Sequence, residues 1–260
     1  MSKETTIFER YPQLRNLRGL VPDKIVEREI AQNTARFELY RKRAQTRIPT
    51  ASLRDLFPAS LASGRIVLEN FLGQSANTSL EELCQICLIA RYLQPQAIFE
   101  FGTYNGCTTL QLAMNTPDTC TMYTLNLPPE KARRMVFDIG EVEQGHVLSS
   151  FNFDVGSYFK GTPFQKRIVQ LWGDSAVFDF SAFHNRMDLV FVDATHTYDY
   201  VKADTENAFR MVRPGSVIIW HDYMQVLHPD VTHYLYEISP HRPIYHLQGT
   251  NLAVHYQGKK

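Results

Sequence analysis

The chain has 260 residues, carries 27 basic and 27 acidic side chains, and is 44% hydrophobic. A chain of this length buries a sizeable core and fits one α/β domain with an appendage. The balanced charge gives no support for binding nucleic acid or a membrane surface, and no apolar run is long enough to span a membrane. Because charges also interrupt the first twenty residues, the sequence predicts a soluble, cytoplasmic protein.

Residues 1–75 are predicted to form a helical extension. Within it, residues 24–47 mix basic and acidic side chains with apolar residues at partly helical spacing, namely Ile25, Ile30, Phe37 and Tyr40. The pattern predicts a helix with one solvated face, packed on the main domain or on a second subunit, and so allows for a homodimer. A nucleic-acid-binding arm is the alternative, but acidic residues interrupt its positive charge at Glu27, Glu29 and Glu38.

Helix and strand patterns alternate through the main domain, residues 76–260. Strands are predicted at 97–101, 121–127, 167–173, 187–193 and 216–222, with a closing pair near 243–247 and 251–257. Helices are predicted from Ser79, after Gly106, within 198–212 and around 231–238. This order predicts a Rossmann-like, doubly wound sheet of seven mostly parallel strands that ends in an antiparallel hairpin. Ligands of such sheets bind at the carboxyl ends of the strands.

The first helix of this domain contains a C-x-x-C pair, Cys84 and Cys87. Ser79 and Glu82 form a capping box ahead of it, and the two cysteines lie within a helical apolar pattern. The remaining cysteines, Cys107 and Cys120, do not form a second pair, so a metal site of paired cysteines is not expected. We predict reduced, buried thiols, which agree with a cytoplasmic protein.

The segment IFEFGTYNGCTT, residues 98–109, has the features of a cofactor cradle. A strand ends in Glu100, and a turn through Gly102 and Gly106 leads into a helix N-terminus with unpaired N–H groups. A dinucleotide site favours G-x-G-x-x-G, and here one glycine of that pattern is absent.

The segment 128–166 is much longer than usual connections in α/β folds. A helix is predicted over 128–140, followed by a run rich in glycine and aromatic residues. We expect this segment to be a lid over cofactor and acceptor, and a decorated surface loop is the alternative.

Polar residues stand at the carboxyl ends of four further predicted strands. They are Asn126, then Gly173, Asp174 and Ser175, then Asp193 and His196, and finally His221 and Asp222. Because these ends meet at one edge of the sheet, their side chains are predicted to converge with Glu100 on one crevice.

Three blocks, VGSYFKGTPFQKRIVQLWGDS, DLVFVDATHTYDYVKADTENAFRMVRPGSVIIWHDY and IFEFGTYNGCTTLQLA, resemble class I S-adenosylmethionine-dependent methyltransferases, specifically methyltransferase family 24. The resemblance runs from about residue 78 to 223. It implies that S-adenosylmethionine binds along the glycine turn, with Asp193 also near the cofactor. The residues implied in the turn are Glu100, Gly102, Thr103, Tyr104 and Gly106.

The resemblance also implies roles at the adenine and ribose ends of the cofactor. Asp174 would accept a hydrogen bond from the adenine amino group, with Ser175 beside it. Asn126 stands where the family usually has an acidic residue that binds both ribose hydroxyls. An amide lacks that charge, so the expected consequence is weaker cofactor binding, or a ribose held by other groups.

A divalent cation is a further expectation from the resemblance. Asp193 and Asp222 end neighbouring strands, and some methyltransferases with this layout bind magnesium there. The companion residue is His221, and a histidine ligand would favour manganese or zinc over magnesium. The alternative is that Asp193 hydrogen-bonds the cofactor or a nearby backbone group and that Asp222 caps a turn. The spacing Asp193-x-x-His196 is similar to the arrangement in which a histidine deprotonates the acceptor hydroxyl, so Asp193 and His196 are the predicted catalytic residues.

The predicted function is methyl transfer from S-adenosylmethionine to a hydroxyl of a small molecule such as a sugar, another natural product or a phenol. Two alternatives stay open at this point. One is a non-catalytic S-adenosylmethionine-binding subunit or scaffold of a biosynthetic complex, which Asn126 favours. The other is an NAD-linked oxidoreductase, which the absent glycine disfavours.

Overall fold

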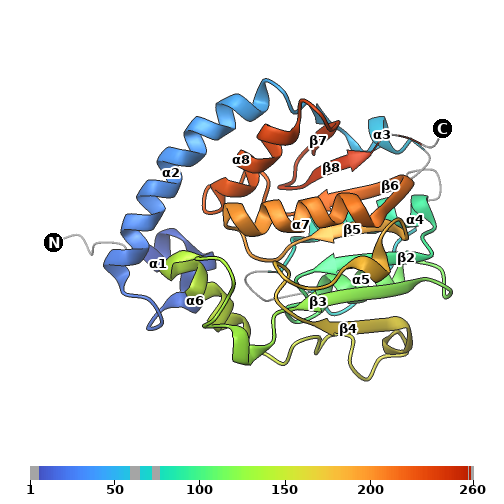
Figure 1. Ribbon diagram of the computed structural model, residues 1–260, viewed down its shortest axis with the longest axis horizontal. Helices are drawn as coiled ribbons and strands as arrows, with labels where there is room; N and C mark the ends of the chain where they lie inside the picture. Colours follow the sequence, from blue (N-terminus) through green and yellow to red (C-terminus); the bar gives the residue numbers. More distant parts are fainter. Residues whose placement is uncertain (1–5, 59–64, 72–76, 257, 259–260) are drawn as a thin grey trace.

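The computed structural model describes residues 6–58, 65–71, 77–256 and 258, and its centre is an eight-stranded sheet. The strands lie in the order β1-β7-β8-β6-β5-β2-β3-β4, and Figure 1 labels those from β7 to β4. Only β8 runs antiparallel to its neighbours. The strands are β1 (Thr50–Ala51), β2 (Ala97–Phe101), β3 (Thr121–Asn126), β4 (Ile168–Trp172), β5 (Met187–Val192), β6 (Val212–Trp220), β7 (Ile244–Leu247) and β8 (Ala253–Tyr256).

This sheet confirms the predicted fold and adds one element to it. All seven predicted strands are present, including the C-terminal antiparallel pair of β7 and β8. The eighth, β1, is a two-residue strand from the N-terminal part of the chain that pairs with β7. Residues 50–51 of the predicted extension therefore belong to the sheet, and the boundary predicted at residue 75 lies outside the described residues.

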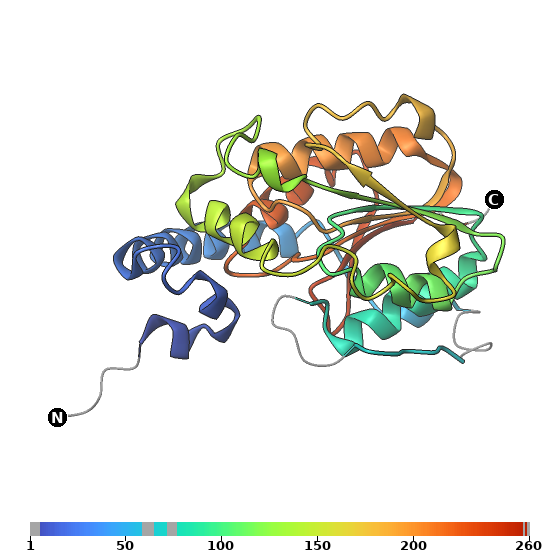
Figure 2. The same ribbon diagram turned by 90° about the horizontal axis from the view of Figure 1, so that it is seen from below.

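Helices cover both faces of the sheet (Figure 2). On one face, α4 (Leu80–Leu93) and α5 (Cys107–Met114) pack on alternate strand residues such as Ile98 and Phe191. On the other face, α7 (Tyr198–Met211) and α8 (Pro229–Ile238) pack on Phe99 and Trp220. Strands buried on both faces explain the continuous apolar runs in the sequence.

The N-terminal extension lies along the edge of this core (Figure 1). It contains α1 (Ile7–Arg10), a 3-10 turn (Pro12–Leu17), α2 (Asp23–Gln45) and α3 (Leu53–Leu56). The long helix α2 packs against α8, while α1 and the 3-10 turn form a small apolar cluster with Val142 and Leu227 of the main domain. The extension therefore packs on its own chain, and the homodimer stays a prediction.

The helix predicted over 128–140 is wrong. Only Pro129–Lys131 forms one 3-10 turn, and the helix of this segment is α6 (Gly140–Ser150). An α-helix would join the N–H of Val136 to the carbonyl of Ala132. Instead, the Val136 N–H donates to Asp174 Oδ2 at 3.0 Å, and the Ala132 carbonyl accepts from Gln144 Nε2 at 2.6 Å. Tertiary hydrogen bonds thus replace the helical one.

The capping box lies where the sequence predicts it, whereas only one of the two cysteines predicted as buried on α4 is fully buried. Ser79 caps α4 together with Glu82, and Cys84 and Cys87 lie on that helix as free thiols, with Cys87 buried. None of the helices in the described parts of the chain is long and apolar enough to cross a membrane.

The strand order places the site. From β2 the chain moves outward through β3 and β4, then returns to add β5 on the opposite side of β2. The carboxyl ends of β2 and β5 therefore border the point where the winding direction reverses, which is where doubly wound sheets bind ligands.

Candidate active site

The glycine turn after β2 packs directly against the end of β5. Gly102 has φ +90°, and its N–H donates to the Leu125 carbonyl at 2.9 Å. A Cβ on Gly102 would lie 1.9 Å from the carbonyl oxygen of Asp193, so no larger residue fits there. Gly106, at φ +80°, begins α5, and a Cβ there would lie 2.6 Å from the Phe159 ring.

Glu100 is buried at the end of β2, with 1% of its surface exposed. Its Oε2 accepts hydrogen bonds from the hydroxyls of Thr109 and Thr124, and Thr124 Oγ1 lies 2.7 Å from Thr103 Oγ1. These hydrogen bonds favour the ionised form, but burial outweighs them and raises the pKa of Glu100 to about 8. The carboxyl is therefore protonated at neutral pH.

Asn126, at the end of β3, is hydrogen-bonded to the glycine turn. Its Oδ1 accepts from the N–H of Tyr104 at 3.2 Å, and its Nδ2 donates to the Leu127 carbonyl at 3.0 Å. An aspartate would accept the first of these bonds but would have no hydrogen to donate in the second.

Asp174, beyond β4, is held by four hydrogen bonds. The Tyr200 hydroxyl lies 3.0 and 2.9 Å from its two carboxylate oxygens, and the N–H groups of Val136 and Ala176 donate to it at 3.0 Å each. The carboxylate is 3% exposed, and it lines the same cavity as Ser175 and the glycine turn.

One cavity of about 430 Å³ joins all of these groups. Asp174 and Ser175 line one part of it, Glu100 and the glycine turn another, and a cluster of histidines and carboxylates a third. Every predicted cofactor-binding residue except Gly106 lines this cavity. Gly106 shapes it from behind, by positioning the start of α5.

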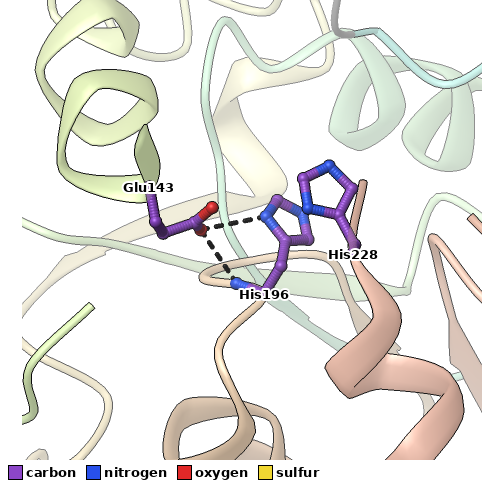
Figure 3. Close-up of side chains that lie close together, drawn as sticks. All are labelled: Glu143, His196 and His228. Carbon is purple, nitrogen blue, oxygen red and sulfur yellow. Dashed lines mark hydrogen bonds and ion pairs between the residues drawn. The ribbon is translucent and has the colours of Figure 1, made fainter. Parts of the chain in front are cut away.

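His196 is the centre of the histidine cluster (Figure 3). Its Nδ1 lies 3.0 Å from Glu143 Oε1, its backbone N–H donates to the same oxygen at 2.9 Å, and its Nε2 lies 3.0 Å from Asp222 Oδ2. The ring stacks on His228, with 3.9 Å between ring centroids. Figure 3 shows Glu143 reaching His196 from α6 while His228 approaches from the loop before α8.

His221 forms a second group beside the first. Its Nδ1 lies 3.2 Å from Asp193 Oδ1 and 3.1 Å from Asp222 Oδ2, and its Nε2 lies 3.4 Å from Glu82 Oε2. The Nδ1 contacts are ion-pair distances, but their angles are not those of hydrogen bonds. Glu82 therefore both caps α4 and borders the site.

These contacts set the charges of the cluster. Burial disfavours the charged imidazolium, but Glu143 and Asp222 hold the pKa of His196 well above its usual value, and Asp222 and Asp193 do the same for His221. Burial likewise opposes ionisation of Glu82, yet His221 lowers the pKa of that carboxyl to about 2. By contrast, burial and the nearby His196 lower the pKa of His228 to about 3, so that ring is neutral.

Two sets of side chains have the spacing of metal ligands among the described residues. One is Asp193, His196 and Asp222, and the other is Glu143, His196 and His228. Within each set, the donor atoms lie within 4.8 Å of one another. The first set contains two of the three predicted ligands, and the third, His221, contacts both of its carboxylates.

Sequence reasoning missed Glu143 and His228 and took Glu82 only as a helix cap. Glu143 lies in α6, which the sequence does not predict, and His228 lies in a loop between a strand and a helix. A usable signal was the pair Glu143 and His146, which are spaced three residues apart and therefore share one face of a helix.

Comparison with known proteins agrees with this geometry. The family model described as a methyltransferase domain, methyltransferase family 24, matches residues 99–223. A protein from Klebsiella pneumoniae assigned as an O-methyltransferase is 16% identical, with a TM-score of 0.51, over 82% of this chain and 93% of that one. A protein from Staphylococcus aureus assigned as a caffeoyl-CoA O-methyltransferase is 15% identical, with a TM-score of 0.50, over 80% of this chain and 93% of that one. At these identities, the similarity is one of fold. A search of curated proteins found no significant match.

Proposed function

Residues 99–223 form a methyltransferase domain of the class I S-adenosylmethionine-dependent type, and on this basis we propose that the protein methylates a hydroxyl oxygen of a small molecule. The observation that carries the proposal is the single cavity that joins the glycine turn to His196. It would place a methyl donor and a group that binds the acceptor's proton in one space, and alignment is the main requirement of methyl transfer.

In the proposed binding mode, the methionine and ribose parts of S-adenosylmethionine lie along the glycine turn and Asn126, and the adenine lies near Asp174 and Ser175. The close packing of Gly102 on Asp193 supports this mode, because it keeps a bare backbone facing the cavity. The four hydrogen bonds to Asp174 support it too, since they fix the carboxylate before any ligand binds.

The acceptor would lie at the end of the cavity formed by α6 and the N-terminal extension. That wall mixes apolar and hydrogen-bonding side chains, namely Asn16, His146, Val147, Ser149, Phe151 and Leu227. Such a lining suits a sugar, another natural product or a phenol, each of which combines apolar surface with hydroxyls. The segment predicted as a lid is thus proposed to be the acceptor-binding wall.

His196 is proposed as the general base. The acceptor oxygen attacks the methyl carbon, the carbon–sulfur bond breaks to release S-adenosylhomocysteine, and the hydroxyl proton passes to Nε2 of His196. The His196 imidazolium first has to release its Nε2 proton to solvent, and the ring then acts in its neutral form, with its Nδ1–H donated to Glu143. The ion pair between Nε2 and Asp222 therefore has to open before the acceptor binds.

Asp193 and Asp222 are the residues that would hold a divalent cation such as magnesium or manganese. Two carboxylates beside an open cavity suit such an ion. When bound, it would supply positive charge to the acceptor oxygen and draw the Asp222 charge away from His196.

His196→Ala tests the proposed base. We expect turnover to fall about 100- to 10,000-fold, because no base remains to take the hydroxyl proton of the methyl acceptor. The affinity for S-adenosylhomocysteine should stay unchanged. The assay measures methyl transfer to a panel of sugars and phenols, and calorimetry measures cofactor binding. His184→Ala is the control, because His184 precedes β5 at the opposite edge of the sheet. Unchanged turnover in His196→Ala would remove His196 from the role of base.

The same measurements separate the two alternatives. A non-catalytic S-adenosylmethionine-binding scaffold would bind S-adenosylhomocysteine yet methylate none of the panel. An NAD-linked oxidoreductase would bind NAD in preference to S-adenosylhomocysteine. The proposal requires both S-adenosylhomocysteine binding and methyl transfer.

A further inference from the structure

We propose that Glu143, His196 and His228 form a binding site for a first-row transition-metal dication, separate from the Asp193 and Asp222 carboxylates. The three side chains come from α6, the loop after β5 and the loop before α8, and the His196 ring lies between Glu143 and His228 (Figure 3). Their donor atoms lie within 4.8 Å of one another, and Glu143 Oε1 is 3.0 Å from His196 Nδ1.

The donor set selects the kind of metal. Two imidazoles and one carboxylate suit zinc, iron, cobalt or manganese, whereas magnesium prefers oxygen ligands in an octahedral arrangement. The two sides of the His196 ring therefore differ in chemistry. Nε2 faces Asp222, Nδ1 faces Glu143, and His228 stacks on the face of the ring.

The ring nitrogens of His228 are free to bind a ligand. No hydrogen bond joins either nitrogen to another of the described residues, and the ring lines the main cavity. Its ring contacts are with His196 and His146, whose centroids lie 3.9 and 6.1 Å away, and the Glu143 carboxylate lies near it. Both nitrogens of His196 contact carboxylates, so His228 is the member of the stacked pair whose nitrogen lone pair has no protein partner.

A second cavity gives access to this point. It has a volume of about 520 Å³ and lies between α2 and the start of α8. Glu143, His196 and His228 line both cavities, so a metal held there would have room for water or other ligands. Metal sites with three protein ligands and open positions have this form.

The site has a consequence that rests on the proposed function. A metal on Nδ1 leaves the proton of the neutral ring on Nε2, so His196 cannot accept the acceptor's proton. Metal binding at this site and base catalysis by His196 exclude each other. A transition metal is therefore expected to inhibit methyl transfer.

Cobalt(II) absorption tests the site without any activity assay. We expect the wild-type protein to bind cobalt(II) with visible bands, and we expect zinc, but not magnesium, to displace it. His228→Gln should weaken cobalt binding at least tenfold, whereas Asp193→Asn should leave it within about threefold; thermal unfolding checks that both variants are folded. Absence of cobalt binding in the wild type would overturn the proposal. The proposal would also be overturned if Asp193→Asn lost cobalt binding while His228→Gln kept it in full.

Zinc inhibition tests the consequence. With magnesium present throughout, zinc should reduce wild-type turnover, and a chelator should restore it. For each protein, turnover is expressed relative to its own zinc-free rate. The zinc concentration for half inhibition should be at least tenfold higher in His228→Gln than in the wild type. Stimulation by zinc would overturn the mutual exclusion. If no methyl transfer is found at all, the proposed function fails while the cobalt result still decides the metal site.

Discussion

The carboxyl group of Glu100 makes the stability of this protein depend on pH in an unusual direction. In the folded protein it holds its proton up to about pH 8, whereas in the unfolded chain it ionises near its ordinary pKa of 4.5. Between these values unfolding releases a proton, so the contribution of Glu100 to stability is complete below pH 4.5 and falls as the pH rises to 8. The loss is about 1.4 kcal/mol per pH unit.

Glu100→Gln should remove this dependence, because an uncharged amide oxygen can accept from the same threonine hydroxyls. We expect the free energy of unfolding of the wild type, relative to Glu100→Gln, to fall by about 2 to 3 kcal/mol from pH 6 to pH 8. Urea unfolding at a series of pH values measures it. Parallel curves for the two proteins would mean that Glu100 is already ionised at pH 6.

At the scale of the element, the glycine turn is defined by its neighbour as much as by its own conformation. Gly102→Ala should abolish measurable S-adenosylhomocysteine binding, because the new Cβ would collide with the Asp193 carbonyl and displace the turn from the cavity wall. Calorimetry measures the binding. Gly161→Ala is a matched control, since Gly161 also has a positive φ, +74°, but nothing lies within 4 Å of its Cβ position.

The control variant should lose only about 1 kcal/mol of stability, the cost of a left-handed alanine, and should bind S-adenosylhomocysteine normally. Equal effects of the two substitutions would show that conformational strain, and not the collision with β5, decides binding.

The sheet was predictable because its signals are local. Each parallel strand is a short apolar run, and the glycine turn and the capping box are written in adjacent residues. The convergence of Asp193, His196, His221 and Asp222 followed from strand order alone, since their strands end at one edge.

The segment 128–150 was not predictable for the opposite reason. Its hydrogen bonds join Val136 to Asp174 and Ala132 to Gln144, and no local pattern shows such pairs. Gly145 lies in α6 although glycine lowers helix propensity. Its reason is tertiary, because a Cβ at this position would be 2.6 Å from Val21 of the N-terminal extension. Because Glu143 lies on this helix, the prediction for the segment did not place its carboxylate beside His196.

At the scale of the whole molecule, the N-terminal extension supports the acceptor-binding wall. Leu17 is fully buried in the apolar cluster that joins the extension to Val142 of α6. Leu17→Ala should destabilise this cluster by about 2 to 5 kcal/mol, through lost apolar contact and the cavity left behind. We expect hydrogen exchange to become faster in α6 and in residues 7–17, with little change in β2 and β5.

Leu39→Ala is the control for this experiment, because Leu39 is 48% exposed on α2. It should leave exchange in α6 unchanged. Faster exchange throughout the sheet in Leu17→Ala would mean that the extension is part of the global folding unit and not a local support for α6.

The two cavities share part of their lining, and these shared side chains would limit the size of the proposed acceptor. Glu143, His196 and His228 separate a space of about 430 Å³ from one of about 520 Å³. Replacing His228 with a small residue would join the two spaces and admit bulkier molecules from the direction of α2. Residues 29–36 of α2, which are far from the methyltransferase domain in sequence, would then face the substrate and help to choose it.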